Sequence, residues 1–405
     1  MPSAAARSAR HSARLLAYSH VTVDFYQGAL AALVPFLVLE RGYTYAAAAG
    51  VVLASSLSSS VVQPLFGALG DRWRLPWLIP VSIFFAGAGM AGIAVSESFW
   101  ITAVVAAVSG VGVAAYHPAG AGRAREISGD DHVLMSWFSL GGNIGFAVAP
   151  LVVAATVGVL GLNASPLLMI PALTGMVAVA LIGRGRVPAT VHTPQRAAVG
   201  RDDWVSFARM SVAIICRSIV FVGMGSFIVL FMHQYRGLSD TFAAVSLFVF
   251  YIGGAFGTAI GGYLARRWPR TTIVRGAYLA AVPVVAGMLM APGSLAFVFI
   301  ALSSIVLYVP FSLHVTLGQD YLPRHMGTAS GVTLGLAVSV GGVAAPVIGA
   351  LADTVGLATA LLPLIALPAI AYLVLLGMPD PPPRTSRQPG DRAALEAVAA
   401  RQTES

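Results

Sequence analysis

Long apolar stretches alternate with short polar breaks along the whole chain. A helix that crosses a bilayer needs about 20 mostly apolar residues, and twelve stretches meet this requirement. The breaks between them contain turn-forming Gly, Pro and Asp together with Arg. The pattern predicts an all-α integral membrane protein with twelve transmembrane helices, over 15–39, 45–69, 77–95, 99–121, 132–156, 164–183, 206–234, 240–265, 273–291, 294–317, 327–351 and 357–377.

Two short strings recur at one spacing. Arg41-Gly42-Tyr43-Thr44 returns 195 positions later as Arg236-Gly237-Leu238-Ser239, and Arg72-Trp73 returns at the same spacing as Arg267-Trp268. Repetition at a fixed period indicates an internal duplication, and duplicated membrane bundles are typical of transporters whose site lies between the halves. We therefore expect two pseudo-symmetric six-helix bundles, 15–183 and 206–377, with a cytoplasmic arm (1–14), a cytoplasmic central loop (184–205) and a disordered cytoplasmic tail (378–405).

Composition and charge support a membrane location. Hydrophobic residues make up 57% of the chain, charged residues only 10%, and the mean hydropathy is +0.82, which excludes a soluble fold. All 24 cationic side chains are Arg, and with the N-terminus in the cytoplasm 21 of them lie inside, two outside (Arg41 and Arg236) and one within the membrane (Arg217). This bias predicts cytoplasmic termini in a plasma (inner) membrane. The net charge of +8 then reflects topology, and we expect no nucleic-acid partner.

Cysteine and histidine content limits the possible cofactors. Cys216 is the single cysteine, so the chain forms no internal disulfide and has no thiolate metal site. The histidines show no convincing metal-ligand spacing along the sequence. We expect a monomer with neither metal nor cofactor, whose partners are the lipid bilayer, protons and a small-molecule substrate.

Small residues spaced four apart form ladders in four of the predicted helices. Such ladders let helix backbones approach closely where lipid provides no hydrophobic driving force. Their symmetric positions predict that the halves meet and slide along these helices; ordinary packing without motion is the alternative. The ladders are Ser55/Ser59, Gly141/Gly145/Ala149, Gly253/Gly257/Gly261 and Gly327/Gly331/Gly335.

Ionisable residues inside the membrane are candidate site residues because their burial is costly. His20, Asp24 and Gln27 are spaced i, i+4 and i+7, so they share one helix face. Arg217 lies at a similar depth in the repeat-related helix. Two interpretations remain open. Asp24 and His20 couple transport to protons and Arg217 contacts substrate, or Asp24 and Arg217 form a permanent ion pair that only joins the halves.

Further polar residues are candidates for the substrate cavity. Tyr116 and His117 lie near the cytoplasmic end of the fourth predicted helix, and His314 lies near the corresponding end of the tenth. Asn143 is in the fifth. Histidines titrate near neutral pH and can relay protons, but a neutral hydrogen-bonding role is equally compatible with the sequence.

The loop Gly67-Ala68-Leu69-Gly70-Asp71-Arg72-Trp73-Arg74 resembles the cytoplasmic loop motif between helices 2 and 3 of the major facilitator superfamily. Its counterpart, Gly262 to Trp268, carries Arg266 where the first copy has Asp71. The resemblance implies the major facilitator fold and a motif that latches the halves in one orientation. The gating candidates that it implies are Gly67, Asp71, Arg72, Arg266 and Arg267.

Within that superfamily the chain resembles exporters of the fosmidomycin-resistance type. The likeness rests on His20-xxx-Asp24-Phe25-Tyr26-Gln27-Gly28, Gln63-Pro64-xx-Gly67, Tyr116-His117-Pro118-Ala119-Gly120, Gly142-Asn143-Ile144-Gly145 with Pro150, and Gly318-Gln319-Asp320-Tyr321-Leu322-Pro323. It implies proton-driven export of small antibiotics, and an anionic compound would suit Arg217. One departure is Ala106, which stands where many antiporters of the superfamily carry Arg.

The leading expectation is therefore a carrier that exports a small polar or anionic compound by proton antiport through alternating access. A proton-coupled uptake symporter for an organic anion is the alternative, and a membrane sensor that does not transport is a weaker one. We do not expect an enzyme, since the chain contains neither a Gly-x-Ser-Gly nor a His-Glu-x-x-His string and no paired-Asp signature.

Overall fold

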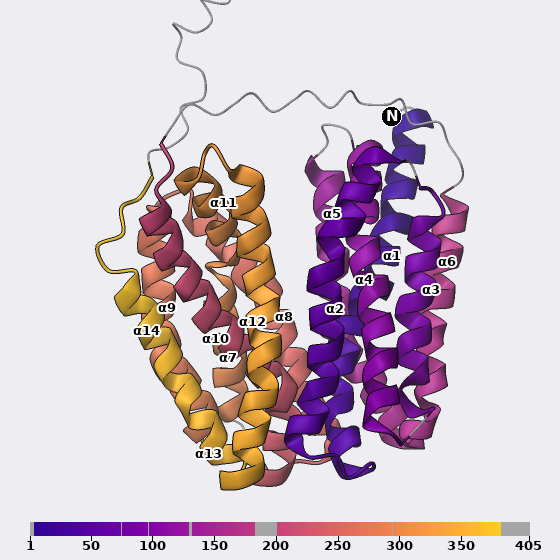
Figure 1. Ribbon diagram of the computed structural model, residues 1–405, viewed down its shortest axis with the longest axis vertical. Helices are drawn as coiled ribbons and strands as arrows, with labels where there is room; N and C mark the ends of the chain where they lie inside the picture. Colours follow the sequence, from indigo (N-terminus) through magenta and orange to yellow (C-terminus); the bar gives the residue numbers. More distant parts are fainter. Residues whose placement is uncertain are drawn as a thin grey trace, which may run out of the picture.

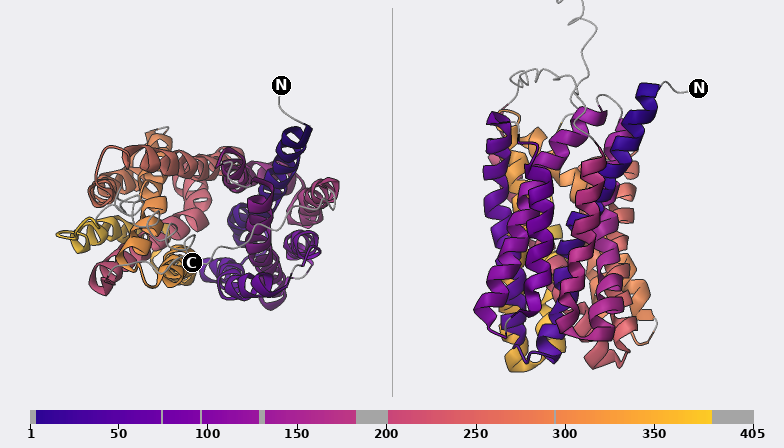
Figure 2. Two further views of the ribbon diagram at one scale, coloured as in Figure 1. Left: turned by 90° about the horizontal axis from the view of Figure 1, so that it is seen from above. Right: turned by 90° about the vertical axis from the view of Figure 1, so that its right-hand side faces the viewer.

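A computed structural model describes residues 4–73, 75–95, 97–128, 132–182, 201–293 and 295–381. These residues form two bundles of long helices that lie side by side (Figures 1 and 2), and they include no strand. Most of the predicted central loop and tail lies outside the described residues. The first bundle contains α1 (Ala4–Leu39), α2 (Tyr45–Arg72), α3 (Leu78–Ala91), η1 (Gly92–Ala94), α4 (Phe99–Ser128), α5 (His132–Leu160), η2 (Leu162–Leu168) and α6 (Met169–Leu181).

The second bundle repeats this order. It contains α7 (Trp204–Arg236), α8 (Asp240–Leu264), α9 (Arg270–Met290), α10 (Leu295–Tyr308), α11 (Phe311–Tyr321), α12 (Met326–Val355), α13 (Leu357–Leu361), η3 (Leu362–Ile365) and α14 (Ala366–Val374). Among the described residues, 11 helical segments are long and apolar enough to cross a membrane, and the shorter segment Leu78–Ala94 fills the remaining predicted position. The prediction of twelve spans in two halves is confirmed.

Three predicted elements differ in detail. The expected arm 1–14 is largely helical, because α1 already begins at Ala4. The tenth predicted helix is interrupted between Tyr308 and Phe311, where Pro310 lacks the N–H that a continuous helix requires. The twelfth, which contains Pro363, is divided into α13, η3 and α14.

The recurring Arg-Gly string has the same structural role in both halves. Gly42 and Gly237 follow α1 and α7 with left-handed φ values of 65° and 64°, a conformation that glycine adopts without steric cost. Arg41 donates from Nη2 to the carbonyl of Ala94 (3.0 Å), and Arg236 donates to the carbonyl of Leu289 (2.6 Å). These two carbonyls are themselves 195 residues apart. The repeated string is thus a brace between the ends of neighbouring helices.

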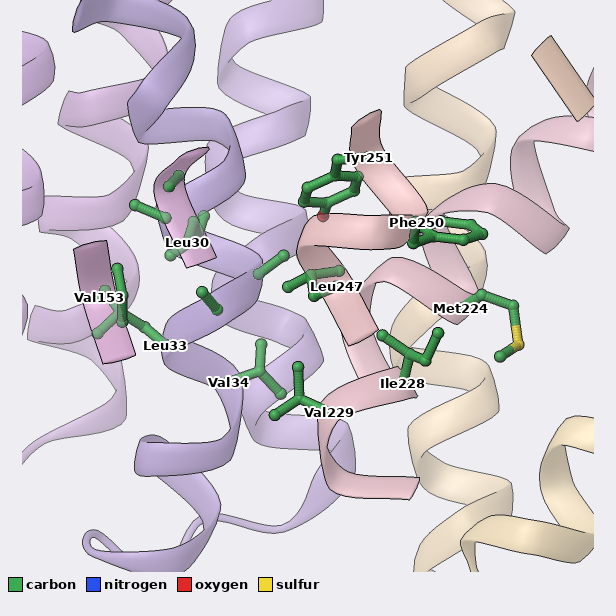
Figure 3. Close-up of a cluster of buried hydrophobic side chains, with 14 of the residues drawn as sticks. Leu30, Leu33, Val34, Val153, Met224, Ile228, Val229, Leu247, Phe250 and Tyr251 are labelled. Atoms are coloured by element: carbon green, nitrogen blue, oxygen red, sulfur yellow. The ribbon is translucent and has the colours of Figure 1, made fainter. Parts of the chain in front are cut away.

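The two bundles meet along three helix pairs, α2 with α12, α5 with α8, and α1 with α7. An apolar cluster fills part of this contact: Leu30 and Val34 of α1 lie close to Val229 of α7 and Leu247 of α8 (Figure 3). We call the end at which α1 begins the N-terminal face. Figure 1 shows the bundles in contact near the opposite face and diverging towards the N-terminal face.

The prediction that the halves meet along the four helices with small-residue ladders is confirmed, since α2 packs on α12 and α5 packs on α8. The ladder glycines of α5 and α8 themselves pack within their own halves, and sliding along the four helices stays a prediction. A methyl group at Gly141 or Gly145 of α5 would collide with backbone carbonyls of α1. Substitution of Gly253 or Gly257 in α8 would likewise crowd α10. Helices inside a bundle cross as closely as helices between bundles, and both kinds of crossing select small residues. Sequence spacing does not distinguish them.

Candidate functional site

The carboxylate of Asp24 lies between two imidazole rings. Its Oδ2 is 3.2 Å from Nε2 of His20, one turn earlier on α1, and its Oδ1 is 3.1 Å from Nε2 of His117 on α4. Gln27 donates from Nε2 to the same Oδ1 (3.0 Å). The predicted shared face of His20, Asp24 and Gln27 is confirmed, and His117 joins it from another helix.

Backbone carbonyls fix the orientation of both rings. Nδ1 of His20 is 2.8 Å from the carbonyl oxygen of Phe138, and Nδ1 of His117 is 2.9 Å from that of Val113. A carbonyl oxygen only accepts, so each Nδ1 carries the hydrogen and each Nε2 faces Asp24. Every Nε2–carboxylate contact therefore needs a further proton, on the ring or on the carboxyl group. His20, Asp24 and His117, which we call the Asp24 cluster, thus have positions for two exchangeable protons.

Close packing from α5 shapes the space around this cluster. A methyl group at Gly142 would collide with Oδ2 of Asp24 and lie 2.8 Å from Cε1 of His20. The His20 ring stacks on Phe138 with centroids 4.1 Å apart. Tyr116 is fully buried, and its hydroxyl is 2.6 Å from Oγ of Ser19. Sequence analysis missed the roles of Phe138 and Gly142, although Gly142 belongs to one of the strings that carried the family resemblance.

His20, Asp24 and His117 each offer one potential metal-ligand atom, and these atoms lie within 4.8 Å of one another. Spacing along the chain did not reveal this group, because His117 is far from Asp24 in sequence and reaches it only through the packing of α4 on α1. The expectation that the protein has no metal site stays a prediction.

Arg217 on α7 has different partners from those that the sequence suggested. Its Nε donates to the carbonyl of Leu307 (2.6 Å), at the end of α10, and its guanidinium lies over the rings of Tyr308 (4.5 Å) and Phe311 (5.0 Å). These partners lie on either side of the break at Pro310. The proposed permanent Asp24–Arg217 ion pair is not formed in this structure, because both groups are directed to other partners.

A narrow cavity, too small for a water molecule in this conformation, adjoins Arg217. Arg217 and His314 are each only 2% exposed, yet Nη2 of Arg217 and Nε2 of His314 have no hydrogen-bond partner in the described part of the chain. Unsatisfied buried polar atoms are rare in proteins and indicate a place for a missing partner. The cavity is lined by Ile214, Arg217, Phe311, His314, Val315, Thr333 and Ala337.

The remaining candidates are less organised. Asn143 is exposed on α5. A methyl group at Gly67 would meet no atom within 4 Å, so this glycine makes no close helix contact here. Arg266 is exposed, and Arg267 lies over the ring of Tyr263 (5.7 Å) in its own half. The side chains of Asp71 and Arg72 are outside the described part of the structure, and the gating role of this loop stays a prediction.

The sequence profile of the Major Facilitator Superfamily matches residues 16–346, which include nearly all of the first half, most of the second, and the polar groups described above. The chain belongs to the major facilitator superfamily. It is therefore a multi-pass membrane transporter and not an enzyme, as predicted.

Two curated relatives from this superfamily cover nearly the whole chain. The fosmidomycin resistance protein of Escherichia coli (strain K12) is 28% identical over 375 residues, which are 90% of this chain and 90% of the relative. The uncharacterized MFS-type transporter YfnC of Bacillus subtilis (strain 168) is 27% identical over 373 residues, 89% of this chain and 91% of the relative. The resemblance to the fosmidomycin-resistance type is confirmed as sequence similarity over nearly the whole chain.

Solved transporters share the fold at low sequence identity. A bacterial homolog of the human lysosomal transporter Spinster, inward-facing and occupied, has a TM-score of 0.75 at 16% identity and covers 89% of this chain and 95% of its own. The nucleoside transporter NupG has a TM-score of 0.73 at 14% identity, with coverage of 91% and 98%. A D-xylose-proton symporter has a TM-score of 0.68 at 13% identity, with coverage of 92% and 98%.

Proposed function

We propose that this transporter exports a small polar or anionic compound in exchange for protons, by alternating access. The observation that carries the proposal is the Asp24 cluster, in which two oriented imidazoles share one carboxylate. A group with two positions for protons, buried inside one half of a carrier, is suited to take up and release protons as the halves move. The similarity to a fosmidomycin resistance protein supports export over other directions of transport.

The number of bound protons changes the charge of the cluster. With both places filled, two imidazolium ions face one carboxylate and the net charge is +1. With one place filled the cluster is neutral, and with none a carboxylate faces two nitrogen lone pairs. Each state favours a different arrangement of the neighbouring helices, since buried charge is costly unless it is compensated. Protonation can thus bias the two orientations of the carrier.

We propose that Arg217 and His314 bind the substrate. The guanidinium charge is buried without a carboxylate partner among the contacts described above, and its Nη2 has no hydrogen-bond partner there. Arg217 also lines the narrow cavity, which must widen to admit a substrate group. An anionic group on the substrate would satisfy this nitrogen and compensate the charge. The flat rings of Tyr308 and Phe311 hold the guanidinium in place.

The distribution of Arg supports an inner-membrane location with the N-terminal face in the cytoplasm. The bundles diverge at this face, so the conformation described here is inward-facing (Figure 1). Each chain holds its own cluster and cavity, and we propose that it works as a monomer without a cofactor.

Flux in inside-out vesicles tests the direction and the coupling. Vesicles with an acidic interior should accumulate fosmidomycin, or another compound from a panel of small anionic antibiotics, and Asp24→Asn should abolish this accumulation. A symporter would drive the compound out of such vesicles instead. Flux that ignores the pH gradient would overturn coupled transport in either direction.

A further inference from the structure

The first turn of α2 is capped from two sides. Within the half, Oγ1 of Thr44 accepts a hydrogen bond from the backbone N–H of Ala47 (3.1 Å). The two preceding N–H groups, of Tyr45 and Ala46, donate to Oδ1 (2.8 Å) and Oδ2 (3.0 Å) of Asp353. The first N–H groups of a helix have no partner within it, and a carboxylate there also interacts favourably with the helix dipole.

Asp353 belongs to the other half of the molecule. It lies near the end of α12, so its carboxylate joins the second bundle to the first at the face opposite the N-terminus. A third hydrogen bond crosses the same boundary, from the hydroxyl of Tyr45 to Oε1 of Gln234 (2.8 Å). The helices touch directly beside these bonds, since a methyl group at Gly349 would lie only 2.7 Å from the backbone N of Ala46.

The repeat-related position has no such cap. Ser239 precedes α8 as Thr44 precedes α2, but it makes no side-chain capping bond. The 195-residue spacing pairs Asp353 with Gly158, which has no carboxylate. Asp240, in the first turn of α8, is 3.0 Å from Nδ1 of His233 in its own half. The bond between the halves is therefore specific to one copy and is not a general feature of the duplicated bundle.

Packing along α2 and α12 differs between the two faces. Gly342 and Gly349 approach α2 so closely that a methyl group at either position would crowd it. Methyl groups added at Gly67 of α2 and Gly335 of α12, both nearer the N-terminal face, would meet no atom within 4 Å. The backbones of α2 and α12 are thus in close contact at the Asp353 end and make no such contact at these glycines nearer the N-terminal face.

We propose that Asp353 is an outer-gate latch, whose carboxylate caps α2 and holds the outward exit closed in the inward-facing state. Opening of this exit requires α2 and α12 to separate, which breaks both charge-assisted bonds. The charge of Asp353 then sets the ratio of inward-facing to outward-facing molecules. This proposal rests on alternating access but not on proton coupling or on the identity of the substrate.

Distances between spin labels in the full-length protein test the latch. In a Cys216→Ala background, labels at Val159→Cys and Met290→Cys report the separation of the halves at this face, since these side chains are 74% and 69% exposed and lie in different halves. Asp353→Asn should raise the ratio of open to closed distances about ten-fold, because the charge and one of two strong bonds are lost. No substrate or pH gradient is needed, so failure of proton coupling would not affect the result.

Two further variants make the test specific. Asp240→Asn removes an equally outward-facing charge that pairs only within its half, and it should leave the distances unchanged. Gly349→Ala keeps every charge but forces a methyl group against the backbone of α2, and it should open the same face. Unchanged distances in Asp353→Asn would overturn the latch whatever Gly349→Ala does, and so would equal opening by Asp240→Asn.

Discussion

The two halves of this transporter carry different chemistry at almost the same place in the repeat. In the first half, the carboxylate of Asp24 lies 3.2 Å from a ring nitrogen of His20 and 3.1 Å from one of His117. Arg217 lies two positions before the residue that the 195-residue spacing pairs with Asp24, and its partners are a carbonyl and aromatic rings. The Asp24 carboxylate lies beside both imidazoles, whereas Nη2 of Arg217 has no hydrogen-bond partner in the described part of the chain.

This difference indicates how duplication and divergence divide the work of transport. The scaffold is the same in both copies, down to the braces made by Arg41 and Arg236. The buried polar groups differ, and the partners of Arg217 lie on either side of a helix break that the first half does not show at Asp24. We infer that the first half handles the proton and the second half handles the substrate.

The largest effect is expected from Asp24→Asn. An amide cannot exchange protons with the two imidazoles, so flux driven by a pH gradient should fall by about 100-fold or more. Gradient-driven flux in vesicles and the amount of folded protein in the membrane should be measured together. Asp240→Asn, which changes an exposed acid outside the cluster, is the matched control. Wild-type coupling in Asp24→Asn would remove the proton role from the first half.

Arg217→Lys should separate charge from geometry in the second half. Lysine keeps the positive charge but does not stack on Tyr308 and Phe311 as a planar guanidinium does. We expect the affinity for the anionic substrate to fall about ten-fold. The amount of protein inserted in the membrane and the pH response of vesicles without substrate should stay unchanged. Arg217→Ala should weaken binding further. Arg217 would instead have a structural role if both variants lost expression and the remaining folded protein bound the substrate with unchanged affinity.

Gly142→Ala tests how tightly the Asp24 cluster is packed. The added methyl group would enter the space of Asp24 and His20, and such overpacking costs about 1–3 kcal/mol. Both the thermal stability and the pH dependence of transport should change. Gly276→Ala in α9, where no atom lies within 4 Å of the new methyl group, should be neutral or slightly stabilising. Identical behaviour of the two variants would mean that the cluster tolerates displacement.

The smallest effect concerns the start of α7, the helix that carries Arg217. Asp203 accepts a hydrogen bond from the backbone N–H of Ser206 (2.9 Å), and the hydrogen bonds from Ser206 lower the pKa of the Asp203 carboxyl group. Its stabilising contribution is therefore present above the ordinary carboxyl pKa and is lost as the pH falls through the lowered folded-state value. Asp203→Ala should cost about 1 kcal/mol or less at neutral pH, measured by thermal unfolding in detergent. A pH-independent difference between variant and wild type would argue against this cap.

Much of the functional region was predictable because it depends on helical periodicity. Spacing of i, i+4 and i+7 placed His20, Asp24 and Gln27 on one face, and the structure keeps them there. Periodicity does not say which helix lies opposite that face. His117 was recognised as a cavity candidate, but its contact with Asp24 depends on how α4 packs against α1.

The sequence by itself determined the twelve spans, the duplication and the positions of the buried polar groups, because hydropathy, spacing and repetition are properties of the chain. Tertiary structure alone decided their partners. It joined His117 to Asp24, turned Arg217 towards the carbonyl of Leu307, and placed Asp353 against the start of α2 in the first bundle. The physical reason is that helices in a membrane are apolar on nearly every side, so hydropathy does not mark neighbours. Close backbone contacts and unsatisfied hydrogen-bond groups select them instead.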